Sequence, residues 1–283
     1  MEIKGIFLFR IYLEKFDQEI KIRYTKDMEE TPLFYVGIDP SQRYQPYVYI
    51  AMDTELRIQA IGDGPLREIL AYLAGLGSAC VAINAPQTVN KGLVDEEEDH
   101  QTLFPVPASK RGDLRKVEFH FLQEGINVHR TPSKLSECMV WVRRGFKLYQ
   151  KILKLGYEEF SKETIRHYVE APAEVIYSRL SGGASLFDSL SLEGRLQRQL
   201  ILYEAGLHIK DAMNFFEEVT RFRLIKGILP ADEIYNPGEL NALACAYLAW
   251  LLHHKPERTT SMGEKNEGIV FFPTKQQEFG RFR

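Results

Sequence analysis

The stretch Phe34-Tyr-Val-Gly-Ile-Asp-Pro40 opens the regular part of the 283-residue chain. Residues 33–38 are continuously apolar, and the run ends in an aspartate and a proline, which is typical of a buried strand followed by a turn. Two further apolar runs, residues 47–52 and 56–61, follow after short polar segments. We therefore expect three strands joined as an antiparallel meander.

A helix and a second buried strand are expected next. The segment Gly62-Asp-Gly-Pro65 breaks the strand pattern, and apolar residues then recur at helical spacing from residue 66 to residue 75. Residues 80–83 are apolar without polar alternation, as expected for a strand that is buried on both faces. Three strands, a helix and a buried strand follow one another in this order in the first half of the ribonuclease H-like fold. The sequence thus predicts an α/β protein with a mixed sheet flanked by helices.

The remaining chain is predicted to contain a long insertion and the second half of the fold. Residues 88–166 are too many for a plain connection between strands, so we expect a mainly helical insertion whose main helix covers residues 139–153. A short strand at residues 168–170, four helices and a closing strand follow. The helices are expected at residues 173–180, 192–204, 209–223 and 240–252, and the closing strand at residues 268–273. We assign residues 31–283 to one domain and residues 1–30 to an N-terminal appendage.

Composition and charge narrow the functional classes. The net charge is −3, so nucleic-acid binding would have to come from a local basic patch rather than from the whole surface. The cysteines, Cys80, Cys138 and Cys245, lack metal-ligand spacing, which suggests a reducing cytoplasm without disulfides. The longest apolar stretch, residues 240–252, is shorter than the roughly 20 residues of a membrane span, so we expect no membrane segment.

Several short motifs arrive in one order along the chain. They are Gly37-Ile-Asp39, Ala82-Ile-Asn-Ala-Pro-Gln87, Val169-Glu-Ala-Pro172, Leu192-Glu-Gly-Arg195 with Arg198, Phe216-Glu-Glu-Val-Thr-Arg221 and Glu239-Leu-Asn-Ala-Leu243. With these motifs and a closing stretch at residues 263–273, the chain resembles the family called domain of unknown function 429 over residues 33–273. The resemblance implies a ribonuclease H-like fold and a predicted nuclease activity.

The resemblance also implies where an acidic site would lie. Related proteins place acidic residues on the first strand, on the buried fourth strand and on the final helix, and the corresponding positions here are Asp39, Asn84 and Asn241. Carboxylates gathered at strand ends hold Mg²⁺ or Mn²⁺ for phosphodiester hydrolysis, because these cations prefer oxygen ligands. Of the three positions only Asp39 carries a charge, since an amide keeps a carbonyl oxygen but no charge.

Three further acidic residues are candidates for this site: Glu170, Glu239, and Asp53, which follows the second strand. Glu170 ends the expected strand at residues 168–170, and we take Asp39 and Glu170 as candidate metal ligands, although a surface carboxylate is the alternative for Glu170. The two asparagines would be neutral ligands or positioners, or else turn and cap residues. Glu239 precedes Asn241 by two residues, about 200° of helical rotation, so it lies near the site or interacts with the helix N-terminus.

Arginines form a second group of candidates. Arginine is suited to bidentate contacts with phosphate, so a cluster at the strand ends could hold a nucleic-acid backbone or a nucleotide. The alternative is a salt-bridged network that holds the insertion to the core. The arginines are Arg115, Arg195, Arg198 and Arg221, and the glutamates nearby in the motifs are Glu118, Glu217 and Glu218. The aromatic residues Phe215, Phe216 and Phe222 are expected in the core.

Three functional hypotheses remain open at this stage. The first is a magnesium- or manganese-dependent nuclease-type phosphodiesterase, with Asp39 and Glu170 as metal ligands. The second is a non-catalytic protein that binds nucleic acid or a nucleotide in the same cleft. The third is a protein that binds a partner through residues 1–30.

Overall fold

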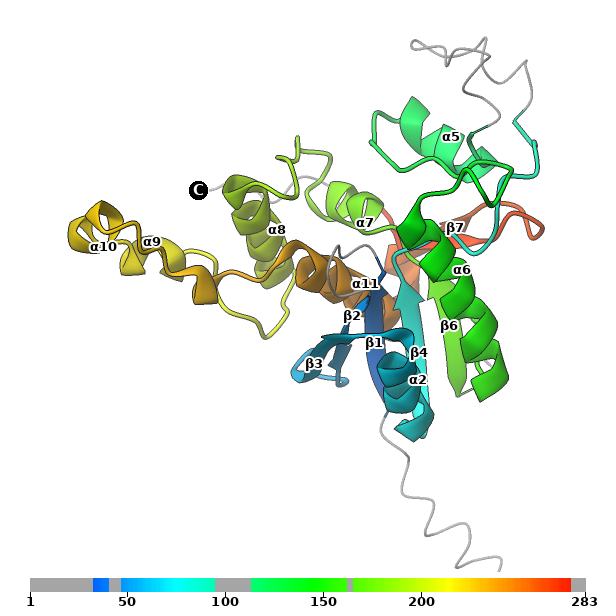
Figure 1. The fold of residues 1–283 in the computed structure, drawn as a ribbon, viewed down its shortest axis with the longest axis horizontal. Coiled ribbons are helices and arrows are strands. Elements are labelled where there is room, and N and C mark those ends of the chain that lie inside the picture. The colour runs from blue at the N-terminus through cyan, green and yellow to red at the C-terminus, as the bar shows by residue number, and fades with distance from the viewer. Residues whose placement is uncertain (1–32, 41–46, 95–112, 162–164, 276–283) are drawn as a thin grey trace, which may run out of the picture. The chain divides into compact units, whose positions relative to one another are not determined.

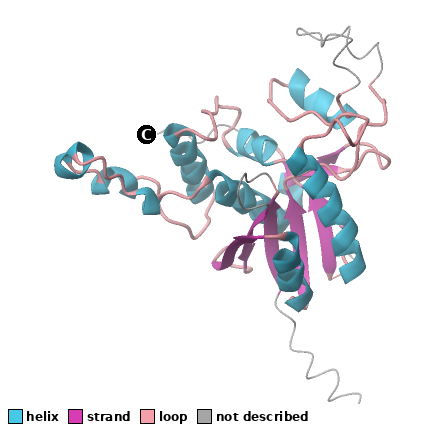
Figure 2. Ribbon diagram, viewed as in Figure 1, coloured by secondary structure: helices cyan, strands magenta, loops and turns pink. Residues whose placement is uncertain are grey.

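The computed structural model describes residues 33–40, 47–94, 113–161 and 165–275. The expected N-terminal appendage, residues 1–30, lies outside the described residues, and so do residues 95–112 of the expected insertion. The described part of the chain is a mixed α/β fold in which helices flank one eight-stranded sheet (Figures 1 and 2). The predicted α/β class is thus confirmed.

The sheet is built around β1 (Leu33–Asp39), which pairs antiparallel with β2 (Tyr47–Met52) and parallel with β4 (Ser78–Ile83). β2 also pairs antiparallel with β3 (Ile58–Gly64), so the predicted meander is confirmed. Beyond β4 the sheet continues with β6, β8 and β7, and β5 also pairs with β6. These strands are β5 (Glu158–Glu159), β6 (Arg166–Glu170), β7 (Thr259–Met262) and β8 (Val270–Pro273). β6 runs parallel to β4 and to β8, whereas β7 is antiparallel to β8.

The strand registers bring three strand ends to one edge of the sheet. Ile38 of β1 is the register partner of Ile83 of β4, and Ile83 is in turn the partner of Glu170 of β6. Parallel strands that are aligned in this way end at the same edge. Asp39, Asn84 and Glu170 therefore all lie at the edge formed by the carboxyl ends of β1, β4 and β6.

Two groups of helices cover the sheet (Figure 2). On one face lie α2 (Leu66–Gly75) and α6 (Val140–Ile152), and on the other α7 (Ala173–Leu180), α8 (Leu192–Glu204) and α11 (Pro237–His254). Successive side chains of a strand point to opposite faces. Val36 and Val81 are accordingly buried under the first group, and Tyr35 and Cys80 under the second.

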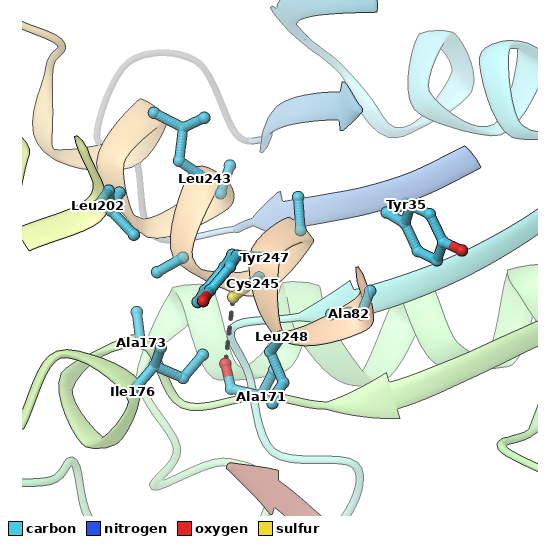
Figure 3. Packing of buried hydrophobic residues seen from close by; sticks show 14 of the residues in the cluster. Tyr35, Ala82, Ala171, Ala173, Ile176, Leu202, Leu243, Cys245, Tyr247 and Leu248 are labelled. Carbon is cyan, nitrogen blue, oxygen red and sulfur yellow. Dashed lines mark hydrogen bonds between the residues drawn. The ribbon is translucent and has the colours of Figure 1, made fainter. Parts of the chain in front are cut away.

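The long helix α11 forms the centre of the second core. It is apolar around most of its circumference and largely buried, as expected of a helix that is covered on several sides. Figure 3 shows its side chains Leu243, Tyr247 and Leu248 among those of the sheet and of α7. The Cys245 thiol of the same helix donates a hydrogen bond to the carbonyl oxygen of Ala171, at 3.2 Å.

Gly37 allows α11 to lie directly against β1. A Cβ atom at this position would overlap the carbonyl oxygen of Ala242 and would lie 2.6 Å from the backbone nitrogen of Ala246. Both helix positions are alanines, so small residues on the two elements let the backbones approach. This close approach brings Asn241, the residue before Ala242, to the end of β1.

The third strand begins two residues later than predicted, at Ile58. The reason is a tight turn organised by Asp53, whose Oδ1 accepts the backbone N–H groups of Glu55 and Arg57. Within the turn Leu56 has a left-handed backbone, with φ of 61°, and its side chain is buried in the core. The apolar character of Leu56 reflects this burial and not a strand.

The single helix predicted at residues 209–223 is wrong. The segment instead forms two short helices, α9 (Asn214–Glu218) and α10 (Arg221–Ile225). The chain between them is extended, and the Thr220 side chain accepts the backbone N–H of Arg223, which caps the start of α10. A β-branched, side-chain-capping residue favours a helix start over a helix interior.

The aromatic side chains of this segment are only partly in the core. Phe215 is buried, as predicted, whereas Phe216 and Phe222 are 55% and 66% exposed. The prediction fails for these two because α9 and α10 extend away from the sheet (Figure 1).

Two of the predicted helices are found where they were expected, and one further α-helix among the described residues was not predicted. The main helix of the insertion and the last long helix are confirmed as α6 and α11. The sequence pattern did not predict α5 (Lys116–Gln123) or β7. The residue before α5, Arg115, is hydrogen-bonded to the distant Glu170, whereas β7 pairs with the next strand in sequence, β8. The short 3-10 helices are η1 (Leu153–Leu155), η2 (Ala231–Glu233) and η3 (Pro256–Arg258).

Candidate functional site

A cavity of about 550 Å³ lies at the edge of the sheet where β4 and β6 end. Val117 and Phe121 of α5, Trp141 of α6 and Val270 of β8 give it apolar walls. Its polar lining comes from Asn84, Arg115, Glu118, His129, Thr131, Glu170, Glu174, Asp188, Ser189 and Asn241. Small-molecule sites typically have such a volume and such a combination of apolar walls with a few polar groups.

Asp39 lies fully buried at the end of β1, beside this cavity. Its Oδ1 accepts a hydrogen bond from Nδ2 of Asn84 at 3.0 Å, and its Oδ2 accepts one from Nδ2 of Asn241 at 3.2 Å. Oδ1 of Asn84 in turn accepts the backbone N–H of Ala173, the first residue of α7, at 3.0 Å. We call Asp39, Asn84 and Asn241 the Asp39 cluster. It joins β1, β4, α7 and α11 at one point.

The orientation of the Asn84 amide is fixed by its two partners. An N–H donor from α7 faces one end of the amide and a carboxylate faces the other, so the oxygen and the nitrogen cannot be exchanged without losing both bonds. An aspartate at this position would place a second carboxylate against Asp39. The two would then need a cation or a proton between them. The amides remove that need, because they supply donors to Asp39 themselves.

Glu170 lies on the opposite face of the sheet from Asp39. Strand alternation places Glu170 on the same side as Tyr168, which packs with α6, whereas Asp39 faces Asn241 of α11. The expectation that Asp39 and Glu170 hold one cation together therefore disagrees with the geometry. The sequence could not settle this, because the face of each side chain depends on the register between β4 and β6.

Glu170 is instead held in a buried ion pair with Arg115. Nη1 of Arg115 donates to Oε2 at 3.0 Å and Nη2 donates to Oε1 at 2.5 Å, which is a bidentate arrangement. The backbone N–H of Gln87 adds a third hydrogen bond, at 2.8 Å. Burial raises the pKa of the Glu170 carboxyl, and the charge and hydrogen bonds of Arg115 oppose that shift. The alternative of a surface carboxylate is wrong for this residue, which is 2% exposed.

Arg115 also binds Glu118, which completes a buried network. Nε of Arg115 donates to Oε1 of Glu118 at 2.7 Å, and the backbone N–H of Thr131 donates to Oε2 at 2.9 Å. Nη1 of Arg115 further donates to the carbonyl oxygen of Glu267. Burial lowers the pKa of Arg115, but the two carboxylates outweigh it and the net shift is upward. The network holds α5 against the end of β6, as the salt-bridge alternative anticipated.

The other candidate arginines also bind protein groups or lie elsewhere. Arg198 is buried, and its Nη2 donates to both carboxylate oxygens of Glu174. Arg195 donates from Nε and Nη2 to the carbonyl oxygens of Tyr235 and Ile234, at 2.9 and 3.0 Å. Arg221 is exposed on α10 and does not line the cavity. The four arginines therefore do not converge on one phosphate.

Glu239 acts at the start of α11. Its Oε2 accepts the backbone N–H of Asn236, and Oδ1 of Asn236 accepts the backbone N–H of Glu239. This reciprocal capping box satisfies helix N–H groups that otherwise lack partners. The structure therefore places Glu239 in the role of an N-terminal helix partner, one of its two predicted roles.

The donor set fits a divalent-metal site poorly. Two-metal hydrolysis concentrates about four positive charges, which several anionic oxygens must offset. Here one carboxylate faces two amide nitrogens, and the nearest other candidate is paired with an arginine on the opposite face. Within the described ranges, no three histidine, cysteine or acidic side chains are grouped so that they could hold a metal ion.

Sequence reasoning missed most of the cavity wall. Phe121 and Val117 come from the helix that was not predicted, and Trp141 comes from the start of α6. Trp141 lies edge-on to His129, with ring centroids 4.8 Å apart. The available signal was the apolar periodicity of residues 117–121, which lie beside basic residues in the predicted, mainly helical insertion, whose main helix was expected only at residues 139–153.

No protein-family model, curated protein or solved structure matches this chain. In addition, no helix in the described part of the chain has the length and apolar character needed to cross a membrane. We therefore infer function from the geometry of the cavity and of the Asp39 cluster.

Proposed function

We propose that this protein has a ribonuclease H-like fold, as its resemblance to the domain of unknown function 429 implies. The strand order β3-β2-β1-β4-β6 supports the proposal, with β1 to β3 antiparallel and with β4 and β6 parallel to β1. The positions of the motifs support it as well. Asp39, Asn84 and Asn241, which lie far apart in the sequence, meet where the acidic residues of such proteins would be.

We further propose that the protein binds a nucleotide, or an unpaired nucleotide of a nucleic acid, without cleaving it. The observation that carries this proposal is that both carboxylate oxygens of Asp39 accept hydrogen bonds from asparagine amides. In this arrangement each carboxylate oxygen faces an amide N–H donor at the positions where an acidic site would place further carboxylates. The residues that would activate a water or hold a leaving group in a nuclease instead join strand ends to helix starts.

The chemistry of the cavity favours the base of a nucleotide as its ligand. Trp141 is partly exposed and offers an aromatic surface to the cavity, and stacking of a base on such a ring contributes about 1–3 kcal/mol. The Asn241 side chain is half-buried and lines the same cavity, where an amide can hydrogen-bond to a base edge.

The charges of the cavity indicate where a phosphate would lie. Four carboxylates line the cavity, and the arginine that lines it uses its N–H donors on protein groups. Glu118 and Glu170 share Arg115, and Glu174 is paired with Arg198, so the lining keeps a net negative charge that disfavours a phosphate inside. We infer that the base and sugar enter and that the phosphate stays at the mouth. The carboxylates are Glu118, Glu170, Glu174 and Asp188, and the arginine is Arg115.

The metal-dependent nuclease is the second candidate function. The convergence of the Asp39 cluster at one sheet edge favours it, because that is where the resemblance implies a Mg²⁺ or Mn²⁺ site. Calorimetric titration with Mn²⁺ and a screen with single-stranded and duplex substrates separate the two functions. If the wild type binds Mn²⁺ and cleaves nucleic acid, and Asp39→Asn loses both, the non-catalytic proposal is contradicted and the nuclease is supported.

Binding itself is tested through the tryptophans. The chain has two, Trp141 in the cavity and Trp250 on α11, so Trp250→Phe leaves a single fluorophore at the site. We expect AMP, adenosine and a single-stranded oligonucleotide to quench its fluorescence, and the matched variant Trp141→Phe to show no change on the same additions. If no probe alters Trp141 emission in a folded protein, the nucleotide proposal is wrong.

A cytoplasmic location is part of the same proposal. Cys80, Cys138 and Cys245 are all free and buried, which agrees with a reducing compartment.

A further inference from the structure

Residues 213–229 form a short helical arm, which contains α9, α10 and the residues that follow α10. Figure 1 shows α9 and α10 extending away from the sheet beyond α8 and α11. Phe215 is the buried residue at the base of the arm, and α9 lies next to η2. The remainder of the arm is at the surface.

The helical arm exposes a concentration of large apolar side chains. Their exposed fractions lie between 46% for Leu229 and 79% for Ile225. The exposed apolar residues of the arm are Met213, Phe216, Phe222, Leu224, Ile225, Ile228 and Leu229. Single exposed apolar residues are ordinary, but seven within 17 residues form a patch of the kind that marks an interaction surface.

The helices of the arm are too short to be stable on their own contacts. α9 and α10 have five residues each, whereas isolated helices shorter than about 12–15 residues are marginal in water. In most proteins such helices are stabilised by packing of an apolar face. Here most of the apolar side chains of α9 and α10 are exposed, so they are available for packing against a partner.

The distribution of charge along the arm makes the arm complementary to a second copy of itself. α9 ends in Glu217 and Glu218, whereas α10 and its following residue carry Arg221, Arg223 and Lys226. One half of the arm is thus acidic and the other half is basic. In a two-fold interface the same surface occurs on both subunits, so each half of one copy meets the opposite half of the other.

We propose that the helical arm pairs with the arm of a second copy of this chain, α9 of each against α10 of the other. The acidic end of each α9 then faces the basic α10 of its partner while the apolar side chains are buried between them. Glu218 and Arg223 already form a pair at 2.7 Å within one arm, with side chains about half exposed. They can therefore exchange partners between copies without a charge being buried alone.

The first test is the mass of the full chain by sedimentation velocity over a range of concentrations. We expect a dimer, and we expect Phe222→Ser combined with Ile225→Ser to raise its dissociation constant by at least about tenfold. The control Leu153→Ser removes a side chain of similar exposure, 51%, at the end of α6, and should leave the dimer intact. A wild-type chain that stays monomeric at all concentrations would overturn the proposal and point to a different partner.

Charge reversal gives a sharper test that does not depend on weakening the fold. Glu217→Lys with Glu218→Lys makes the whole arm basic, and Arg221→Glu with Arg223→Glu makes it acidic. Each variant alone should dimerise at least about tenfold more weakly, because like charges then face one another. In an equal mixture the two variants should form a heterodimer with about the affinity of the wild-type dimer. If the mixture behaves like the separate variants, α9 and α10 do not face each other and the pairing is wrong.

Discussion

Asn84 donates a 3.0 Å hydrogen bond from Nδ2 to Oδ1 of Asp39, across the ends of two neighbouring parallel strands. The same amide accepts the first N–H of α7. An aspartate at this position would accept the α7 N–H equally well, but it could not donate to Asp39 unless it were protonated. The choice between amide and carboxylate at residue 84 therefore decides whether Asp39 meets a hydrogen-bond donor or a second carboxylate from β4.

Aspartates at residues 84 and 241 should create a dependence on divalent ions. Asn84→Asp with Asn241→Asp replaces two donors to a buried carboxylate by two further carboxylates. We expect the free energy of unfolding to fall by about 3–5 kcal/mol without metal, and Mn²⁺ to recover much of the loss in the variant only. Thermal unfolding with and without Mn²⁺ measures both effects.

The control for this double variant places the same two added charges at exposed asparagines, Asn127→Asp with Asn214→Asp. It should show no stabilisation by Mn²⁺. If the Asn84 and Asn241 variant also gains none, the cluster is not arranged as a potential cation site, and the relation to acidic ribonuclease H-like sites loses its support.

Gly37→Ala should disrupt the packing of α11 on β1. The added methyl group would meet backbone atoms of Ala242 and Ala246, which cannot move by rotating a side chain. Overpacking of this kind typically costs about 1–3 kcal/mol, and backbone contact places the expected loss at the upper end. Chemical denaturation measures it. Gly75→Ala is the matched control, because a Cβ at that exposed helix position meets nothing within 4 Å and should be neutral or slightly stabilising.

Removing Arg115 should leave two buried carboxylates without their cation. We expect Arg115→Met to lower the free energy of unfolding by about 3–5 kcal/mol. Arg115→Lys should recover only part of this, because an ammonium group cannot form the bidentate contact with Glu170. Urea unfolding followed by circular dichroism measures each variant.

Two comparisons decide whether the loss at Arg115 comes from uncompensated charge. Adding Glu118→Gln and Glu170→Gln to Arg115→Met should recover much of the stability, since no buried charge remains. Arg57→Met breaks an exposed pair with Glu55 and should change stability by less than about 1 kcal/mol. A triple variant that is no more stable than Arg115→Met would mean that shape, not charge, holds α5 in place.

Stability should decrease as the pH falls from 6.5 to 4 because of His167. Its Nε2 lies 3.1 Å from Nε2 of His253, and burial followed by the charge of His253 lowers its pKa from 6.5 to about 4. Between these values the unfolded chain binds a proton that the folded chain does not, so acidification favours unfolding. His167→Phe should reduce the slope of unfolding free energy by up to about 1.4 kcal/mol per pH unit.

The pH effect is measured by urea unfolding at a series of pH values for wild type, His167→Phe and the control His208→Gln. His208 is exposed, and His208→Gln controls for the loss of one histidine from the chain. Equal slopes for all three proteins would exclude His167 as the titrating group.

Much of the α/β framework could be predicted from the sequence. The apolar runs of β1, β2 and β4 and the helical spacing of α2 and α11 are local patterns, and they reflect burial that each segment needs wherever it packs. The close contact of Gly37 with α11 was not predictable in the same way, although the glycine itself was visible. Residues 209–223 were predicted as one helix because their apolar period continues through Thr220, whose side chain in fact caps the start of a second helix.

For the candidate site too, the sequence predicted some features and the tertiary structure decided others. The sequence determined which side chains stand at the ends of β1, β4 and α11, and thus that one carboxylate and two amides were available there. Only the tertiary structure decided that the amides donate to Asp39, that Glu170 lies on the other face with Arg115, and that α5 and Trp141 close a cavity beside them. The physical reason is that the face of a strand residue and the partner of a buried charge depend on register and packing between segments distant in sequence.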